Sequence, residues 1–295
     1  MQNILVIGSI NMDMVMMCDR VPESGETLNG RDFECNLGGK GANQAIACAK
    51  LGGSVKMLGC VGQDGNGAKA IQDLKSFGVD VSCIRTVDGP TGVAMIIVCN
   101  GDNRILIDKG ANGFLTPSMI DESVDVIKWA DVVVLQLEIP METVIYAAKC
   151  VKQLGKTVVL NPAPIAPLSE ELIALSDWII PNETESLSLT GCKEGTDWET
   201  VLEKILELGA KNAMITLGEK GCIYSCGKER KYGKAYPVKA VDTTAAGDTF
   251  VGAWCTALCN GNSLEKAVDF AARASAVTVT RKGAGMSIPT LDEIE

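Results

Sequence analysis

The chain has 295 residues, with 27 lysines and arginines against 37 aspartates and glutamates, so its formal net charge is −10. This acidic balance argues against binding to a nucleic-acid backbone, which requires a basic face, and favours a protein that handles small molecules. The longest apolar run is Val93–Cys99. Because a membrane-spanning helix needs about 20 apolar residues, we expect no membrane partner.

The chain contains no histidine, so any general base must be a carboxylate, lysine, tyrosine or cysteine. Ser-His-Asp and Cys-His catalysis are thereby excluded, as is every zinc site that needs imidazole. The 12 cysteines form no paired C-x-x-C framework, and no charged segment of the secretory type precedes the apolar run Ile4–Ile7. We therefore expect reduced thiols in a cytoplasmic protein, with a metal or redox site as the alternative.

Apolar runs and helical periodicity alternate along the chain. The expected strands are Ile4–Ile7, Val55–Val61, Val132–Leu135, Thr157–Leu160, Trp178–Ile180 and Ala213–Leu217. The expected helices are Asn43–Leu51, Ala68–Phe77, Pro117–Trp129, Met141–Leu154, Trp198–Leu208, Ala246–Asn260 and Leu264–Val279. Strands that are apolar throughout indicate a parallel sheet covered on both faces. The pattern predicts one α/β domain over residues 1–295, an open sandwich with a mostly parallel central sheet.

Two segments without helical character interrupt this alternation. Met14–Cys35 carries proline, glycine and mixed polar residues, whereas Thr91–Asp108 has the pattern of a strand hairpin that turns at Asn100–Asn103. Residues 14–35 and 91–108 together predict a small β-sheet that projects from the main domain as a lid. Two long surface loops are the alternative.

The strongest chemical signal is the stretch Asp242–Phe250, in which small residues lead directly into an apolar helix. Backbone N–H groups at such a helix start are unpaired and point to one place, where the helix dipole stabilises an anion. Asp248 lies within the first turn beside that place. Its carboxylate can accept a proton from a hydroxyl while the N–H groups hold the charge of a transferred phosphoryl group. Helix capping is the alternative function of these residues.

Two further stretches have the composition of ligand-binding turns. In Leu37–Ala45, three glycines allow close approach of the backbone to a ligand, and Asn43 is expected to cap the helix or line the site. Ser9–Asp13 follows the first strand, and the carboxyl ends of parallel strands are where α/β proteins bind ligands. There, Asn11 and Asp13 could bind a polyol through hydrogen bonds. A flexible turn and an Asx turn are the respective alternatives.

A fourth stretch, Pro181–Glu185, places Asn182 and Glu185 on one face of a helix start. Such a pair can organise Mg²⁺ through water, and capping is again the alternative. Two common nucleotide motifs are missing. Gly62–Gly67 is not followed by the Lys-Ser/Thr pair of a Walker A motif, and no G-x-G-x-x-G follows the first strand.

Taken together, these stretches resemble the signatures of the ribokinase family, also called the phosphofructokinase-B family. Gly38–Ala45, followed by Gly52 and Gly62, is similar to the first signature, and Asp242–Asp248 to the second. The resemblance extends over nearly the whole chain. The stretches most similar to ribose-phosphorylating members are Gly8–Asp13, Gly38–Ala45, Leu160–Pro164, Pro181–Glu185 and Val279–Ala284. The resemblance implies transfer of a phosphoryl group from ATP to the 5-hydroxyl of D-ribose, with Mg²⁺ accompanying ATP and K⁺ as an activating cation.

The resemblance also implies a role for individual residues. The sugar-binding positions match Asn11, Asp13, Gly39, Lys40, Asn43, Glu138 and Asp248. Asp248 matches the catalytic base, and the anion hole matches Ala245, Ala246 and Gly247. The ATP-binding positions match Asn182, Thr216, Leu217, Gly218, Glu219, Lys220, Gly221, Gly247 and Ala272. Glu185 matches the residue that holds Mg²⁺ through water, and the K⁺ site matches Asp242, Thr244, Thr278, Arg281, Gly283 and Ser287.

Two features of the resemblance bear on assembly and on the family branch. The lid also forms the dimer contact in relatives, so we expect a homodimer. An exposed lid sheet has unpaired edges and one apolar face that a second copy could cover. Ala245 departs from the glycine that is common in the wider family, and this departure favours the ribose-specific branch.

Two other functions remain open. A family kinase for 2-deoxyribose, fructose, a nucleoside or a sugar phosphate is the first. A nucleoside needs an aromatic stacking partner, and the lid segments offer only Phe33, with Phe114 just beyond them. A sugar phosphate needs extra cations, and the lid cations Arg20, Arg31, Arg104 and Lys109 are typical of a solvated surface. The second is a non-catalytic sugar or nucleotide sensor, which we expect to have lost the base or the anion hole.

Overall fold

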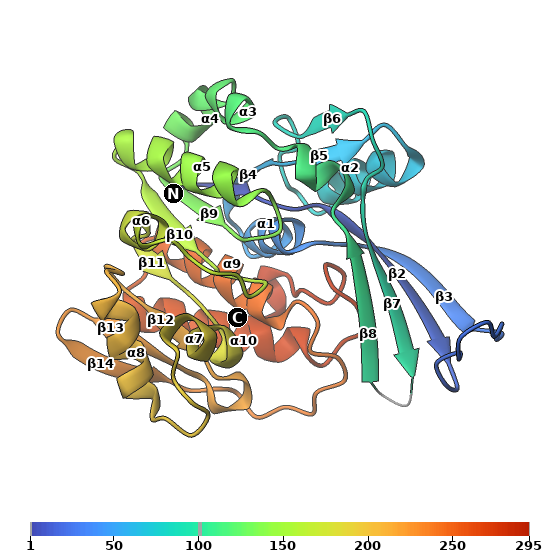
Figure 1. The fold of residues 1–295 in the computed structure, drawn as a ribbon. Helices are drawn as coiled ribbons and strands as arrows, with labels where there is room; N and C mark the ends of the chain where they lie inside the picture. Colours follow the sequence, from blue (N-terminus) through green and yellow to red (C-terminus); the bar gives the residue numbers. More distant parts are fainter. Residues whose placement is uncertain (1, 100–101, 295) are drawn as a thin grey trace.

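The computed structural model describes residues 2–99 and 102–294, and its central layer is a parallel five-stranded sheet of order β11-β10-β9-β1-β4 (Figure 1). These strands are β1 (Asn3–Ile7), β4 (Ser54–Leu58), β9 (Val132–Leu135), β10 (Thr157–Leu160) and β11 (Trp178–Ile179). Two isolated parallel bridges, Ile179 to Ala213 and Asn182 to Thr216, extend this layer into an antiparallel sheet. Its strands are β12 (Met214–Thr216), β13 (Cys222–Cys226) and β14 (Glu229–Gly233). The expected mostly parallel α/β architecture is confirmed.

Strand β1 shows why helices cover both faces of the sheet. Ile4 and Val6 point into one core and Leu5 and Ile7 into the other, and all four side chains are fully buried. The first core contains α1 (Lys40–Lys50), α2 (Gly65–Ser76), α9 (Ala246–Cys259) and α10 (Leu264–Thr278). The second contains α3 (Pro117–Asp121), α4 (Val124–Trp129), α5 (Met141–Gln153), α6 (Glu170–Leu175), α7 (Glu183–Thr190) and α8 (Trp198–Glu207). Short 3-10 helices occupy Gly110–Phe114, Gly218–Lys220 and Leu291–Glu293.

Two expected elements are each divided in the structure. The expected strand Val55–Val61 is β4 followed by β5 (Cys60–Gly62), which pairs with β6 (Arg85–Val87). Gly59 separates them at a point where an added Cβ would lie 2.7 Å from the Gly8 carbonyl oxygen. The expected helix Pro117–Trp129 is α3 followed by α4. The break falls at Ser123, whose hydroxyl donates to the Met119 carbonyl at 2.7 Å and whose backbone leaves the helical region.

A separate four-stranded sheet of order β3-β2-β7-β8 projects from the main body (Figure 1). Its strands are β2 (Asn11–Cys18), β3 (Arg31–Gly38), β7 (Gly92–Cys99) and β8 (Asp102–Asp108). β2 and β7 run parallel, and the outer pairs are antiparallel. The sheet extends beyond the expected segments 14–35 and 91–108, because β2 begins at Asn11 and β3 ends at Gly38. Part of the expected turn at Asn100–Asn103, residues 100–101, lies outside the described residues.

Large apolar side chains are exposed on the projecting sheet, with Leu106 on β8 76% exposed. Within residues 2–99 and 102–294, no helix has the length and apolar character needed to cross a membrane. All 12 cysteines are free thiols, and the described ranges hold no group of three or more cysteines, aspartates and glutamates arranged for a metal ion.

Candidate active site

The candidate site lies at the carboxyl ends of neighbouring strands in the central sheet. Ile7, Leu135 and Leu160 are register partners at the ends of β1, β9 and β10. The residues that follow these strands therefore meet at one edge, the usual ligand edge of an α/β sheet. Here the Glu138 carboxylate accepts hydrogen bonds from the Ser9 hydroxyl at 2.5 Å and from the backbone N–H of Lys40 at 3.1 Å.

Asp248 is held rigidly in the first turn of α9. Its side chain is buried, and each carboxylate oxygen accepts one hydrogen bond from α1. The Asn43 amide donates at 3.0 Å to one oxygen, and the Gln44 amide donates at 3.0 Å to the other. Because the two donors come from another helix, the orientation of the Asp248 carboxylate is fixed by the packing of α1 on α9.

A chain of buried amides fixes Gln44 in turn. Its amide nitrogen also donates to Asn161 at 3.0 Å, and its oxygen accepts from Gln136 at 2.7 Å. The Asn161 amide donates to the Ile180 carbonyl at 2.8 Å. With both ends of the Gln44 amide engaged, its nitrogen must face Asp248. No role was expected for Gln44, Gln136 or Asn161, although Gln136 and Asn161 each directly follow an expected strand.

The projecting sheet contributes Asn11 and Asp13, which lie two residues apart on β2 and therefore share one face. Asn112, for which no role was expected, orients Asn11. It is buried, and its amide donates to the Asn11 side-chain oxygen at 2.7 Å and to the Ile10 carbonyl at 3.1 Å, while its oxygen accepts from the Ile10 N–H at 2.8 Å. Asn112 thereby joins the Asn11 side chain to the backbone of Ile10, the residue just before β2.

The glycines before α1 allow the backbone to approach β2 closely. A Cβ on Gly38 would lie 2.1 Å from an Asp13 carboxylate oxygen. A Cβ on Gly39 would lie 2.8 Å from the Asn11 nitrogen, and Gly39 has φ 90°, which favours glycine. Gly39 is also the N-terminal cap of α1. The capping role considered for Asn43 is therefore wrong, because Asn43 lies one turn inside the helix and faces Asp248.

The charged groups of this region act on one another. Burial, together with the nearby carboxylates of Glu138 and Asp248, raises the pKa of Asp13 to about 7. Burial works to lower the pKa of Lys40, but the carboxylates of Asp248, Glu138 and Glu185 outweigh it and raise that pKa above its usual value. These mutual effects place the groups in one electrostatic neighbourhood.

Glu185 belongs to the same neighbourhood through α7. Burial raises its pKa, the Asn182 N–H and Lys40 oppose this increase, and Asp248 adds to it. Asn182 caps α7: its side-chain oxygen accepts from the Glu185 N–H at 2.8 Å, and its own N–H donates to the Glu185 carboxylate at 2.9 Å. The capping interpretation of this pair is therefore confirmed. One Glu185 oxygen is occupied by the cap.

The start of α9 combines backbone strain with open space. Ala245 has φ 61°, a left-handed conformation that glycine adopts more readily, at the position where the wider family often has glycine. The Ala246 N–H donates to the Thr243 carbonyl at 3.2 Å, so it is already engaged. At Gly247, an added Cβ would meet no atom within 4 Å. The first turn of α9 therefore faces a space beside Gly247.

The expected nucleotide residues are partly brought together. Thr216 bridges to Asn182, and its N–H donates to the Pro181 carbonyl at 3.0 Å. The loop beyond it closes through the Leu217 N–H, which donates to the Gly221 carbonyl at 2.7 Å, and leaves Gly218, Glu219 and Lys220 exposed. Ala272 is distant in sequence and is buried on α10 in the first core.

The expected cation residues are also only partly assembled. One Asp242 carboxylate oxygen accepts from the N–H and hydroxyl of Thr244, at 2.9 and 2.7 Å, and the other accepts from the Gly283 N–H at 3.0 Å. Asp242 thus links the two loops. The remaining side chains bond elsewhere: Thr278 donates to Ala274, Ser287 donates to Ala284, and Arg281 pairs with Glu293.

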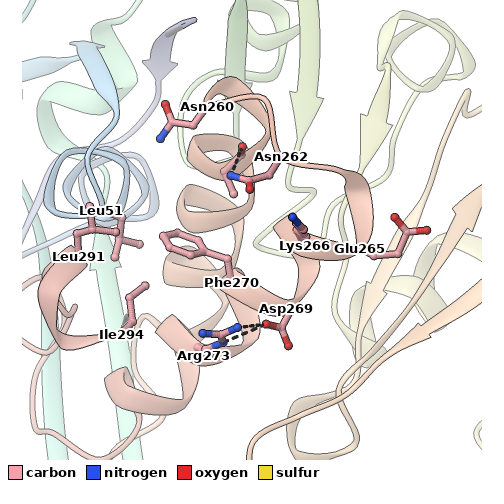
Figure 2. A pocket seen from close by; sticks show the side chains of 11 residues that line it. Leu51, Asn260, Asn262, Glu265, Lys266, Asp269, Phe270, Arg273, Leu291 and Ile294 are labelled. Atoms are coloured by element: carbon pink, nitrogen blue, oxygen red, sulfur yellow. Dashed lines mark hydrogen bonds and ion pairs between the residues drawn. The ribbon is translucent and has the colours of Figure 1, made fainter.

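A surface pocket of about 540 Å³ lies away from these residues, on α10 and the C-terminal 3-10 helix (Figure 2). Phe270, Leu291 and Ile294 line its apolar part, and Asp269 and Arg273 pair with each other at its rim. It contains none of the residues expected to bind sugar or nucleotide. This pocket is therefore separate from the candidate site, which is identified by the converging polar groups around Asp248.

Comparison with known proteins gives concordant matches. The family model described as pfkB family carbohydrate kinase matches residues 1–291. The ribokinase of Schizosaccharomyces pombe is 41% identical over 309 residues, covering 100% of this chain and 97% of that protein. The deoxyribokinase of Salmonella typhi is 38% identical over 296 residues, covering 99% and 97%. The structure of Arabidopsis thaliana ribokinase complexed with ribose and ATP matches with a TM-score of 0.94 at 34% identity, covering 99% and 97%.

Proposed function

We propose, from the premise that this chain belongs to the pfkB family of carbohydrate kinases, that it transfers a phosphoryl group from ATP to the 5-hydroxyl of D-ribose. The observation that carries the proposal is the environment of Asp248. A buried carboxylate, oriented by Asn43 and Gln44, lies in the first turn of a helix that opens onto free space at Gly247. A base and an anion-binding helix start are thus side by side.

The chemistry follows from this juxtaposition. Asp248 accepts the proton of the sugar hydroxyl as the oxygen attacks the terminal phosphorus of ATP, the bond from that phosphorus to the bridging oxygen breaks, and ADP leaves. The N-terminus of α9 stabilises the negative charge on the transferred group. Since phosphoryl transfer depends mostly on positioning and charge stabilisation, the rigid support of Asp248 matters as much as its basicity. The projecting sheet acts as a lid that excludes water and so limits hydrolysis of ATP.

The polar groups around Asp248 fit an uncharged polyol. Asn11, Asp13, Gly39, Lys40, Asn43 and Glu138 form the sugar subsite in this proposal. Within the described residues, the Asn43 side-chain oxygen is buried without a hydrogen-bond partner, so a sugar hydroxyl would satisfy it. Carboxylates outnumber Lys40 in this neighbourhood, and their field disfavours an acceptor that already carries a phosphate.

ATP is assigned to the adjacent edge, with Asn182, the loop Thr216–Gly221, Gly247 and Ala272 as its binding residues. The parallel β-bridge between Asn182 and Thr216 places these two residues side by side, which supports their binding the same nucleotide. Glu185 suits an outer contact with Mg²⁺ through water, because its carboxylate is buried near Asp248 and one oxygen remains outside the helix cap. When bound with ATP, Mg²⁺ neutralises part of the phosphate charge.

The activating cation completes the proposal. K⁺ is assigned between the Asp242–Thr244 and Arg281–Ser287 loops, which Asp242 links through Gly283. Because the side chains of Thr278, Arg281 and Ser287 bond elsewhere, their backbone oxygens would be the ligands. Replacing K⁺ by choline in the assay should lower kcat. An unchanged kcat would contradict the proposal of an activating K⁺ site.

The relative that acts as a deoxyribokinase makes 2-deoxyribose the second candidate acceptor. The two sugars differ only in the hydroxyl at carbon 2, so discrimination depends on whether that hydroxyl has a partner in the site. A site built to bind a hydroxyl rejects the analogue that lacks it, since its polar groups are left unpaired.

Product analysis tests the proposal directly. The enzyme is incubated with ribose, Mg-ATP and K⁺, and the products are identified by phosphorus NMR. We expect the native enzyme to form ADP and ribose 5-phosphate in equal amounts. Asp248→Asn should form both products much more slowly. Phosphate attached at another carbon, or ADP formed equally without sugar, would contradict the proposed reaction.

A further inference from the structure

Cys18 and Cys99 lie side by side at the distal ends of β2 and β7. They are register partners in the parallel pairing of these strands. Backbones of adjacent strands are roughly 4.8 Å apart, which is within the Cα separation of about 4.4–6.8 Å that a disulfide accepts. In a parallel pair, register partners project to the same face of the sheet. The backbone spacing is therefore compatible with a bond between the two sulfurs.

The thiols are directed toward each other's strand. The Cys18 thiol donates to the carbonyl of Val98, the residue before Cys99, at 3.9 Å. The Cys99 thiol donates to the carbonyl of Asp19, the residue after Cys18, at 3.4 Å. These crossed contacts place both sulfurs in the space between the two strands. The presence of Cys99 also contributes, after burial, to the raised pKa of Cys18.

The surroundings give solvent access to one thiol and protection to the other. Cys99 is partly exposed, whereas Cys18 is only 9% exposed. The ion pair between Arg31 and Asp19, at 2.5 Å, lies beside them. Other thiols of the chain, such as Cys48 and Cys255, are fully enclosed in the first core.

We propose that Cys18 and Cys99 are a modification site, at which hydrogen peroxide forms a reversible disulfide across the lid sheet. The Cys99 thiolate attacks the peroxide and becomes a sulfenic acid, while the O–O bond breaks and the leaving oxygen departs as water. The Cys18 thiolate then attacks that sulfur, the S–O bond breaks, and a second water leaves. The two thiols lose two electrons and two protons in total, and the peroxide is reduced. The bond ties β2, which carries Asn11 and Asp13, to β7.

Intact-mass analysis with peptide mapping tests the site on the full-length enzyme. After treatment with hydrogen peroxide, we expect the loss of two hydrogen atoms, a peptide pair linked through Cys18 and Cys99, and full reversal by dithiothreitol. Cys99→Ser should abolish the linked pair. The matched control Cys83→Ser, which changes a partly exposed thiol elsewhere, should leave it intact.

A second variant separates this chemistry from a folding defect. In Cys18→Ser, Cys99 lacks its resolving thiol and should accumulate a sulfenic acid that dimedone labels, whereas the native enzyme should give little label. The proposal is overturned if Cys99 of the native enzyme is labelled as strongly as in Cys18→Ser. It is equally overturned if peroxide links other cysteines, or none, while this pair stays reduced.

Discussion

Asp248 receives its two hydrogen bonds from Asn43 and Gln44, so its carboxylate is held in one orientation. We predict that Asp248→Asn lowers kcat by roughly 10²–10⁴-fold, the usual contribution of a general base. The dissociation constant for sugar should stay within a few-fold, since the amide can still bond to Asn43 or to sugar. Steady-state kinetics and sugar titration measure both. Asp292→Asn, at an exposed position, is the matched control, and full turnover in Asp248→Asn would contradict the base assignment.

Asp13 gives the fold a specific pH dependence. Its pKa in the folded protein is about 7, above the ordinary 3.8, because of burial and then Glu138 and Asp248. The folded state therefore binds more protons than the unfolded state between these values, and stability falls as pH rises through this window. Asp13→Asn removes this loss of unfolding free energy. Because the pKa of Asp13 is about three units above its ordinary value, the loss is at most about 4 kcal/mol.

Urea unfolding at a series of pH values measures this effect. The gain in unfolding free energy of Asp13→Asn over the native enzyme should be small near pH 4 and should grow until about pH 7. Asp292→Asn again serves as the control. A gain that does not change with pH would show that Asp13 has an ordinary pKa in the folded protein.

At the scale of single residues, the sequence indicated the groups proposed to touch substrates better than the groups that support them. Asp248, Asn43 and Asp13 stand in stretches whose composition predicts ligand binding. Gln44, Gln136, Asn161 and Asn112 act only through partners far away in sequence, such as the contact between Gln136 and Gln44. No local pattern marks such pairs, because their hydrogen bonds exist only after β9, β10 and α1 have packed together.

At the scale of elements, the start of α9 offers a test that separates function from folding. An added Cβ at Gly247 meets nothing within 4 Å in the protein alone. Gly247→Ala should therefore preserve or raise stability, by about 0.5–1 kcal/mol as for glycine replaced in a helix. If the space holds the transferred phosphoryl group, the same methyl group should lower kcat/KM at least tenfold.

Thermal unfolding and kinetics of Gly247→Ala provide the two measurements. Gly113→Ala is the matched control, because an added Cβ there also meets no atom within 4 Å. An unchanged kcat/KM in Gly247→Ala, with an unchanged melting temperature, would contradict the placement of the transferred phosphoryl group at this helix start.

Element boundaries followed the sequence wherever one local pattern decided them. Val132–Leu135 and Thr157–Leu160 are observed as expected, since the last three residues of each are apolar and buried in the sheet. The beginning of β2 was missed because Asn11 and Asp13 look like a turn. They form a strand because their backbone pairs with β3 on one side and with β7 on the other. The division at Gly59 depends on the distant Gly8 carbonyl, and so had no local signal.

At the scale of the whole molecule, the apolar surface of the lid sheet supports assembly. Leu106 is 76% exposed, and its register partner Met95 on β7 is exposed on the same face of the sheet. A second copy could bury this surface. We predict a dimer in sedimentation at micromolar concentration and a monomer for Leu106→Glu. Ile165→Glu, at an exposed apolar residue outside the sheet, should remain dimeric. A monomeric native enzyme would contradict this assembly.

An ADP-release assay with Mg-ATP and K⁺ across a panel of acceptors is the most direct test of the proposed phosphorylation of ribose. The panel comprises ribose, 2-deoxyribose, fructose, fructose 6-phosphate, tagatose 6-phosphate, adenosine and pseudouridine. We predict that ribose gives the highest kcat/KM and that the phosphorylated sugars are poor, because carboxylates surround Lys40. A higher kcat/KM for another acceptor would contradict the ribose assignment, and the roles proposed for Asn11, Asp13, Asn43 and Glu138 would then be redrawn around that acceptor.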